Sequence, residues 1–268
     1  MKKLLIALQF LTIIPVRIKT AINEADIIGS ASAFIVVGIM QGLLLIVTDV
    51  IAGMVFHSDL VMGLTLFVLV VSNGGFHLDG LADTFDAIAV KSGGNPEIDR
   101  QKRLAVMKDS TTGPIGVIAI IFVLSLKYLS LKNLSNFLPF TYYSSLILLP
   151  VMPKWTMTLA MFYGKPARED GLGRLFIGKI GFREVAISTL TFIFLLAVFH
   201  LFLGHYSPAN QYVFYAVSLI VLYVFSRALV NFFNKKFGGL SGDMLGAMSE
   251  LTEITFLLMV IVWSQLST

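Results

Sequence analysis

Seven long apolar segments occupy most of the chain, and they constrain its fold more than any other feature. They lie roughly at 27–56, from 60 into the aspartate-rich stretch after 73, and at 113–131, 136–152, 185–203, 211–233 and 243–266. Crossing a bilayer as a helix takes about 20 apolar residues. Only 13% of the residues are charged, against roughly 25% in soluble domains. The sequence predicts an all-α polytopic membrane helix bundle, with about seven transmembrane helices in a single integral membrane domain spanning 1–268.

The N-terminus resembles a signal peptide at first sight. Two lysines precede the apolar stretch 4–16, but Gln9 interrupts that stretch, Pro15 ends it, and no small-residue cleavage site follows. About 11–13 apolar residues are too few to span a bilayer. We therefore expect a short retained helix that is interfacial or re-entrant.

The positions of the basic residues predict the orientation. With the N-terminus in the cytoplasm and seven alternating spans, all 20 lysines and arginines except Lys127, Lys132 and Arg227 fall in cytoplasmic segments. This pattern obeys the positive-inside rule. It predicts a multi-pass protein of the cell (inner) membrane, with its N-terminus and the polar stretches 74–86, 103–110 and 238–243 on the cytoplasmic side. Because the basic residues form no stripe with interleaved aromatic residues, nucleic acid is not an expected partner. The absence of cysteine excludes thiolate metal sites and a cysteine nucleophile.

The polar stretch Gly74–Asp86 carries three aspartates. Asp79, Asp83 and Asp86 are spaced i, i+4 and i+7, which places them on one face of a helix. Clustered carboxylates repel one another unless a cation lies between them, and hard oxygen ligands suit Mg²⁺. The alternative is that Asp79 caps a helix while the other two face solvent.

The last span carries three further acids, Asp243, Glu250 and Glu253, on one helix face. Glu253 is on the order of 15 Å from the start of this helix, near the middle of a bilayer. A carboxylate at that depth needs a polar cavity or a cation. Arg227 of the preceding span is the expected partner. A buried pair that serves only helix packing is the alternative.

Several motifs occur together and in order. They are the stretch 74–86, the stretch 103–110 with Gly113 and Gly116, the loop Arg168-x-x-Gly171-Leu172-Gly173, and the stretch 238–243 followed by Glu250 and Glu253. In these motifs the chain resembles the cobalamin synthases, also called adenosylcobinamide-GDP ribazoletransferases, over nearly its whole length. Two positions depart from the family pattern. Ser241 replaces a usual threonine but keeps the hydroxyl. Ala87 stands where glycine is common, which weakens the case for Asp86.

The resemblance implies an enzyme that joins α-ribazole or its 5′-phosphate to adenosylcobinamide-GDP and releases GMP in the presence of Mg²⁺. The expected metal ligands are Asp79, Asp83, Asp86, Asp243, Glu250 and Glu253. The expected catalytic residues are Asp83, His77, Lys108 and Asp109, with the general base left open between Asp83 and His77. The expected substrate-binding residues are Arg103, Lys108, Arg168, Arg227 and Ser241. A homo-oligomer is left open.

Two other functions use similar residues. A membrane CDP-alcohol phosphotransferase also has aspartates on a helix near the cytoplasmic face, but its longer aspartate signature does not occur here. An ion-coupled transporter could use Glu250, Glu253 and Arg227 as a relay, yet the sequence shows no repeat with matching broken helices. Release of GMP from a GDP-activated corrinoid would exclude both.

Overall fold

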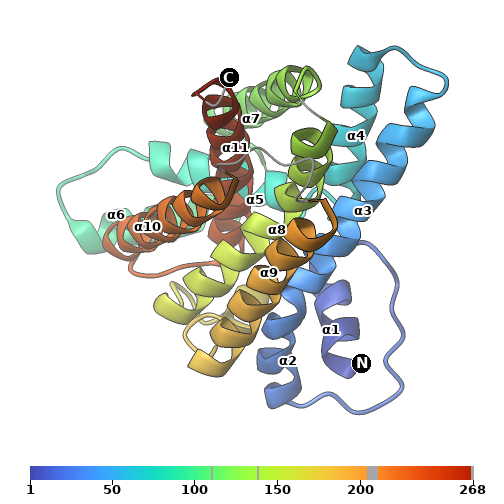
Figure 1. The fold of residues 1–268 in the computed structure, drawn as a ribbon. Helices are drawn as coiled ribbons and strands as arrows, with labels where there is room; N and C mark the ends of the chain where they lie inside the picture. Colours follow the sequence, from blue (N-terminus) through green and yellow to red (C-terminus); the bar gives the residue numbers. More distant parts are fainter. Residues whose placement is uncertain (110, 138, 204–210, 267–268) are drawn as a thin grey trace.

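The structure, a computed structural model, describes residues 1–109, 111–137, 139–203 and 211–266. Its described part is helical and contains no strand, which confirms the all-α prediction (Figure 1). The helices are α1 (Lys2–Leu11), α2 (Glu24–Ser30), α3 (Phe34–Gly53), α4 (Ser58–Ser72), α5 (Phe76–Ala89), α6 (Pro96–Val106), α7 (Pro114–Leu134), α8 (Pro139–Tyr163), α9 (Phe182–Leu203), α10 (Gln211–Phe237) and α11 (Gly242–Leu266), with short 3₁₀ turns η1 (Ala31–Ala33) and η2 (Leu172–Leu175).

Six helical segments of the described chain are long and apolar enough to cross a membrane, and a bent pair raises the number to seven. The bent pair is α4 and α5, whose axes differ by 82°. Gly74 and Gly75 form the break, and both have positive φ angles that glycine adopts without a steric penalty. The second predicted segment is therefore a bent pair of helices, and the helix after the bend carries the aspartates.

Helix α8 is the most deeply buried of these segments and packs against α3, α9, α10 and α11. The Gly38-x-x-x-Gly42 spacing of α3 serves this contact. A Cβ at Gly42 would lie 2.6 Å from the Cα of Ile147, so only glycine lets the two helices approach this closely.

The predicted end of this span was wrong. Helix α8 continues through Pro153 to Tyr163, so Lys154 is a buried helical residue and not the start of a cytoplasmic loop. The loop that follows begins only at 164.

Helix α1 is short and packs against α2, η1 and α3, beside the candidate spans and not among them (Figure 1). The ring of Phe10 packs against those of Phe34 and Phe176, with centroids 5.8 and 4.6 Å away. This arrangement agrees with the short, non-spanning N-terminal helix expected from the sequence, and its retention stays a prediction.

Two loops distant in the sequence are joined by a short backbone ladder. Leu240 N–H donates to the carbonyl of Lys165 (2.7 Å), and Ala167 N–H donates to the carbonyl of Leu240 (2.8 Å). A Cβ at Gly239 would lie 2.5 Å from the Lys165 oxygen, so this contact requires glycine. The ladder holds the segment after α8 against the start of α11, which places Arg168 beside Asp243.

The predicted orientation can be tested by cysteine labelling, since the chain has no cysteine of its own. Glu169 is exposed in the loop between α8 and α9, and Asn136 is exposed between α7 and α8. We expect a Glu169→Cys variant to react with an impermeant maleimide only from the cytoplasmic side. An Asn136→Cys variant should react only from the opposite side. The reverse pattern would contradict the orientation.

Candidate active site

The aspartates of α5 meet the start of α11 because glycines bring the two helices together. A Cβ at Gly80 would lie 2.5 Å from the carbonyl oxygen of Asp243, and one at Gly246 would lie 3.1 Å from the Cα of His77. The helices run antiparallel along this contact. Asp79 is exposed and Asp83 is half-buried, so both reach the surface at the end of the bundle where α11 begins.

Asp79, Asp83 and Asp243 form one anionic group with Arg168, which we call the aspartate cluster. Asp83 interacts electrostatically with Asp79, Asp243 and Arg168, and also with Asp86. The guanidinium of Arg168 donates from Nη2 to Oδ2 of Asp243 at 2.5 Å. Three carboxylates and one guanidinium leave two negative charges uncompensated. That charge and the hard oxygen donors fit a divalent cation such as Mg²⁺.

Ser241 supports this cluster from the N-terminus of α11. Its hydroxyl donates to Oδ2 of Asp243 (3.3 Å) and accepts the backbone N–H of Met244 (3.3 Å). A serine at this place satisfies one of the free amide groups of the first turn. The hydroxyl that Ser241 shares with threonine thus has a structural use here, and its contact with substrate stays a prediction.

Asp86 lies on the same helix but is already bonded. Its carboxylate accepts the backbone N–H groups of Gly113 (2.6 Å) and Gly116 (2.8 Å) at the start of α7. A Cβ at either glycine would lie within 2.6 Å of the Asp86 carboxylate. The structure therefore gives Asp86 the role of anchoring α7, while its assignment as a metal ligand stays a prediction.

These two roles of Asp86 predict different effects. If Asp86 anchors α7, the Asp86→Ala variant should lose roughly 0.5–2 kcal/mol of stability, as for other lost helix caps, and should lose less activity than variants of Asp79. Thermal unfolding in detergent and a turnover assay separate the two effects. Unchanged stability together with abolished turnover would instead support a metal ligand.

Lys108 approaches the aspartate cluster from the loop after α6. Its ammonium lies 2.5 Å from Oδ2 of Asp170. The other oxygen of that carboxylate, Oδ1, lies 3.7 Å from Nε of Arg168. The hydrogen bond from Lys108 lowers the pKa of Asp170 below its usual value. Asp109 is bonded within its own loop. It accepts hydrogen bonds from the backbone and hydroxyl of Thr111, which lower its pKa. Ser110 lies outside the described residues.

Two predicted substrate-binding arginines lie elsewhere. Arg103 is buried and donates to the carbonyl of Lys236 (3.4 Å), which ties α6 to α10. Arg227 lies over the ring of Tyr163, 3.8 Å from its centroid, where α10 passes the end of α8. Their contact with substrate stays a prediction, and the structure does not bring them to the aspartate cluster.

The predicted pairing of Arg227 with the glutamates of α11 was wrong. Lys127 of α7 occupies that place, with its ammonium 2.5 Å from both Glu250 and Glu253. All three side chains are at least 98% buried. Lys154 of α8 is also fully enclosed and interacts electrostatically with both glutamates. We call these four residues the buried charge network. Two ammonium groups balance two carboxylates within it.

His77 borders this network. Its Nδ1 lies 3.1 Å from the hydroxyl of Ser249. One ligand atom each of His77, Glu250 and Glu253 lies within 4.8 Å of the others. However, the Lys127 ammonium already takes the place that a cation would need. The group therefore fits a divalent cation poorly, and metal binding by Glu250 and Glu253 stays a prediction.

The sequence reasoning missed three residues near these sites: Lys127, Lys154 and Asp170. A signal existed for Lys127, because a lysine within a long apolar segment requires a partner as much as the two glutamates do. Asp170 occupies a position between the fixed residues of the Arg168 motif, and only the folded loop shows its contact with Lys108.

Comparisons with known proteins identify the family of the chain. The sequence model of a family described as cobalamin-5-phosphate synthase matches residues 3–261. Proteins named adenosylcobinamide-GDP ribazoletransferase are similar over almost the full length of both chains. That of Thermodesulfovibrio yellowstonii is 37% identical over 98% of this chain and 97% of its own. Those of Thermoanaerobacter pseudethanolicus and Clostridium tetani are 34% and 31% identical, each over 96% of this chain and over 96% and 95% of their own. No solved structure matches. The chain therefore belongs to the cobalamin-5-phosphate synthase family and is a membrane enzyme of that family.

Proposed function

We propose that this enzyme transfers the phosphocobinamide group of adenosylcobinamide-GDP to α-ribazole or α-ribazole 5′-phosphate and releases GMP. The observation that carries the proposal is the aspartate cluster, in which carboxylates of α5 and α11 lie beside Arg168, with Lys108 near the same loop. Transfer at a pyrophosphate depends mainly on charge neutralisation and positioning, and this cluster supplies groups of both signs.

The reaction breaks the phosphoanhydride bond of the pyrophosphate and forms a new phosphoester bond. A ribose hydroxyl oxygen of the nucleoside bonds to the phosphorus nearest cobinamide, the bond from that phosphorus to the GMP oxygen breaks, and the hydroxyl proton must be accepted. Of the two candidates for the base, Asp83 is half-buried within the aspartate cluster, whereas His77 is buried against Ser249. The structure favours Asp83, because a general base must come within hydrogen-bonding reach of the substrate hydroxyl.

Asp79, Asp83 and Asp243 would hold Mg²⁺. When bound, this ion would withdraw charge from the phosphate oxygens and stabilise the leaving GMP. Lys108 and Arg168 would bind phosphate oxygens from the loop side, where substrate phosphate would compete with Asp170, which contacts both cations.

We further propose that the aspartate cluster faces the cytoplasm from the inner membrane and that residues 1–268 act as one catalytic domain. Purified enzyme in nanodiscs, given adenosylcobinamide-GDP, α-ribazole and Mg²⁺, should form GMP and a cobamide in equal amounts. Omission of α-ribazole should abolish GMP release. GMP release independent of the nucleoside, or no release from a folded protein, would contradict the proposal.

A further inference from the structure

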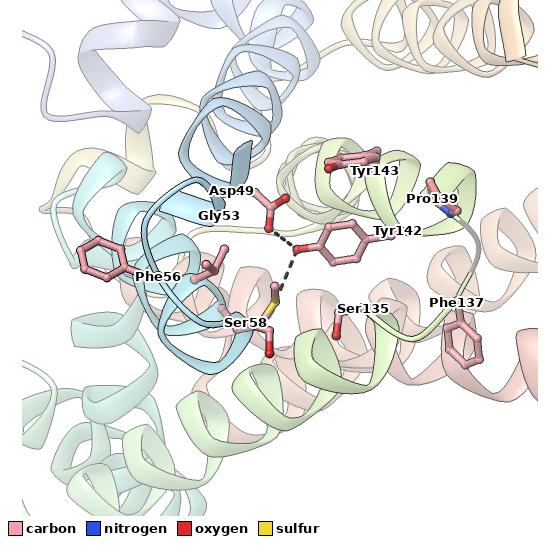
Figure 2. Close-up of a pocket in the computed structure, with 11 residues that line it drawn as sticks. Asp49, Gly53, Phe56, Ser58, Ser135, Phe137, Pro139, Tyr142 and Tyr143 are labelled. Carbon is pink, nitrogen blue, oxygen red and sulfur yellow. Dashed lines mark hydrogen bonds between the residues drawn. The ribbon is translucent and has the colours of Figure 1, made fainter. Parts of the chain in front are cut away.

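A cavity of about 360 Å³ opens at the opposite end of the bundle from the aspartate cluster (Figure 2). It lies where α3 ends and α4 begins, and where α7 ends and α8 begins. Helix α7 starts at Pro114 beside Asp86 and ends at Leu134 beside this cavity, so roughly 30 Å of helix separates the two. The catalytic function proposed above does not use this cavity.

The main polar group of the cavity is the carboxylate of Asp49, which is only 7% exposed. The hydroxyl of Tyr142 donates to its Oδ1 at 2.5 Å, and the hydroxyl of Tyr143 also interacts with it. Figure 2 shows Asp49 and Tyr142 pointing toward one another, with Tyr143 beside them. Beyond the bond from Tyr142, the Asp49 carboxyl oxygens keep lone pairs that can accept further hydrogen bonds from a donor in the cavity.

No lysine, arginine or histidine among the described residues forms an ion pair with Asp49. Lys132, in the last turn of α7 beside this cavity, is paired instead with Asp59 at 2.8 Å. Both of those side chains are about half exposed. A buried carboxylate without a counter-ion is costly in free energy. The adjacent cavity offers the space in which a counter-ion could lie.

The walls of the cavity suit an organic cation. The rings of Tyr142 and Tyr143 lie edge to face with centroids 5.2 Å apart, and Met62 contributes a polarizable sulfur 3.4 Å from the Tyr142 hydroxyl. Aromatic rings attract ammonium groups through their negative faces. The volume is many times the roughly 30 Å³ share of one water molecule, so the cavity can take more than a bare ion.

The position also matches the level of lipid headgroups. The segment that joins α3 to α4 exposes large apolar side chains, with Met54 and Val55 each at least 75% exposed. Such side chains at the end of a span are stable in the interface of a bilayer. We propose that this cavity binds a small organic ammonium group, supplied either by an ethanolamine phospholipid headgroup or by a free amine.

Thermal unfolding of the purified enzyme in nanodiscs tests this proposal. Discs of phosphatidylglycerol alone are compared with discs that also contain phosphatidylethanolamine, and free ethanolamine is titrated into the first kind. At ligand levels about 100-fold above Kd, we expect the melting temperature to rise by about 5 °C or more. Asp49→Asn should abolish the rise while keeping the shape of the side chain. Asp59→Asn, which alters an exposed carboxylate nearby, should retain it.

The two sources give different results. A rise with phosphatidylethanolamine but not with ethanolamine identifies the lipid, and a rise with both shows that the amine alone suffices. No rise with either, or an equal rise in Asp49→Asn, would overturn the proposal. Should Asp49→Asn fail to fold, native mass spectrometry of the wild-type enzyme decides. Preferential retention of phosphatidylethanolamine over phosphatidylglycerol supports the site, and equal retention overturns it.

Discussion

Replacing Asp79 or Asp83 with alanine should reduce turnover by at least about 10²-fold, which is the usual scale for removing one group that stabilises transition-state charge. The expectation rests on where the two side chains lie. Both side chains reach the surface of the same helix face, beside Asp243 and Arg168. Within the described residues, neither side chain accepts a hydrogen bond like those of Asp86, so the fold should persist. GMP release at saturating substrate and Mg²⁺ is the measurement, with thermal unfolding recorded in parallel.

The control for this prediction is Asp59→Ala. Asp59 is an exposed aspartate at the other end of the bundle, where it pairs with Lys132. Its loss should leave turnover unchanged. Near-normal turnover in purified, folded Asp79→Ala or Asp83→Ala would contradict the metal and catalytic assignments of the aspartate cluster. If both residues hold Mg²⁺, raising the Mg²⁺ concentration should restore part of the activity in Asp79→Asn.

The predicted features that proved right depend on local patterns. Each span follows from the hydropathy of a continuous segment, and the common face of Asp79 and Asp83 follows from helical periodicity. The broken second span also left a local signal, the adjacent Gly74 and Gly75, although only the structure shows the 82° bend. Local patterns were therefore sufficient for the fold class and for the helix that carries the site.

The features that the sequence did not reveal depend on contacts between distant segments. Lys127 and Glu250 are 123 positions apart, and only the packing of α7 against α11 brings them together. Lys154 follows Pro153, and proline usually marks a helix boundary. Helix α8 nevertheless continues past both residues, where Lys154 is balanced by the glutamates of α11. The partner of a buried charge could not be chosen from span order alone.

The buried charge network predicts the largest loss of stability from a single substitution. Lys127→Met keeps an unbranched side chain of similar length but removes one of two balancing ammonium groups. Glu250 and Glu253 would then share Lys154 alone, with one negative charge uncompensated in a buried site. Breaking a buried pair in this way costs roughly 3–5 kcal/mol. We expect a correspondingly lower melting temperature in detergent. Arg227→Met, which leaves this network intact, is the matched control and should be far less affected.

The double variant Lys127→Met with Glu250→Leu separates packing from catalysis. It restores charge balance, because Lys154 then faces Glu253 alone. Replacing a buried pair by apolar residues of similar volume is often neutral or stabilising, so stability should recover. Glu250 is paired with Lys127 and lies about two helical turns from Asp243, away from the aspartate cluster. We therefore expect GMP release to recover as well. A stable but inactive double variant would show instead that Glu250 takes part in the reaction, as a metal ligand or otherwise. Unchanged stability in the single Lys127→Met variant would contradict the network itself.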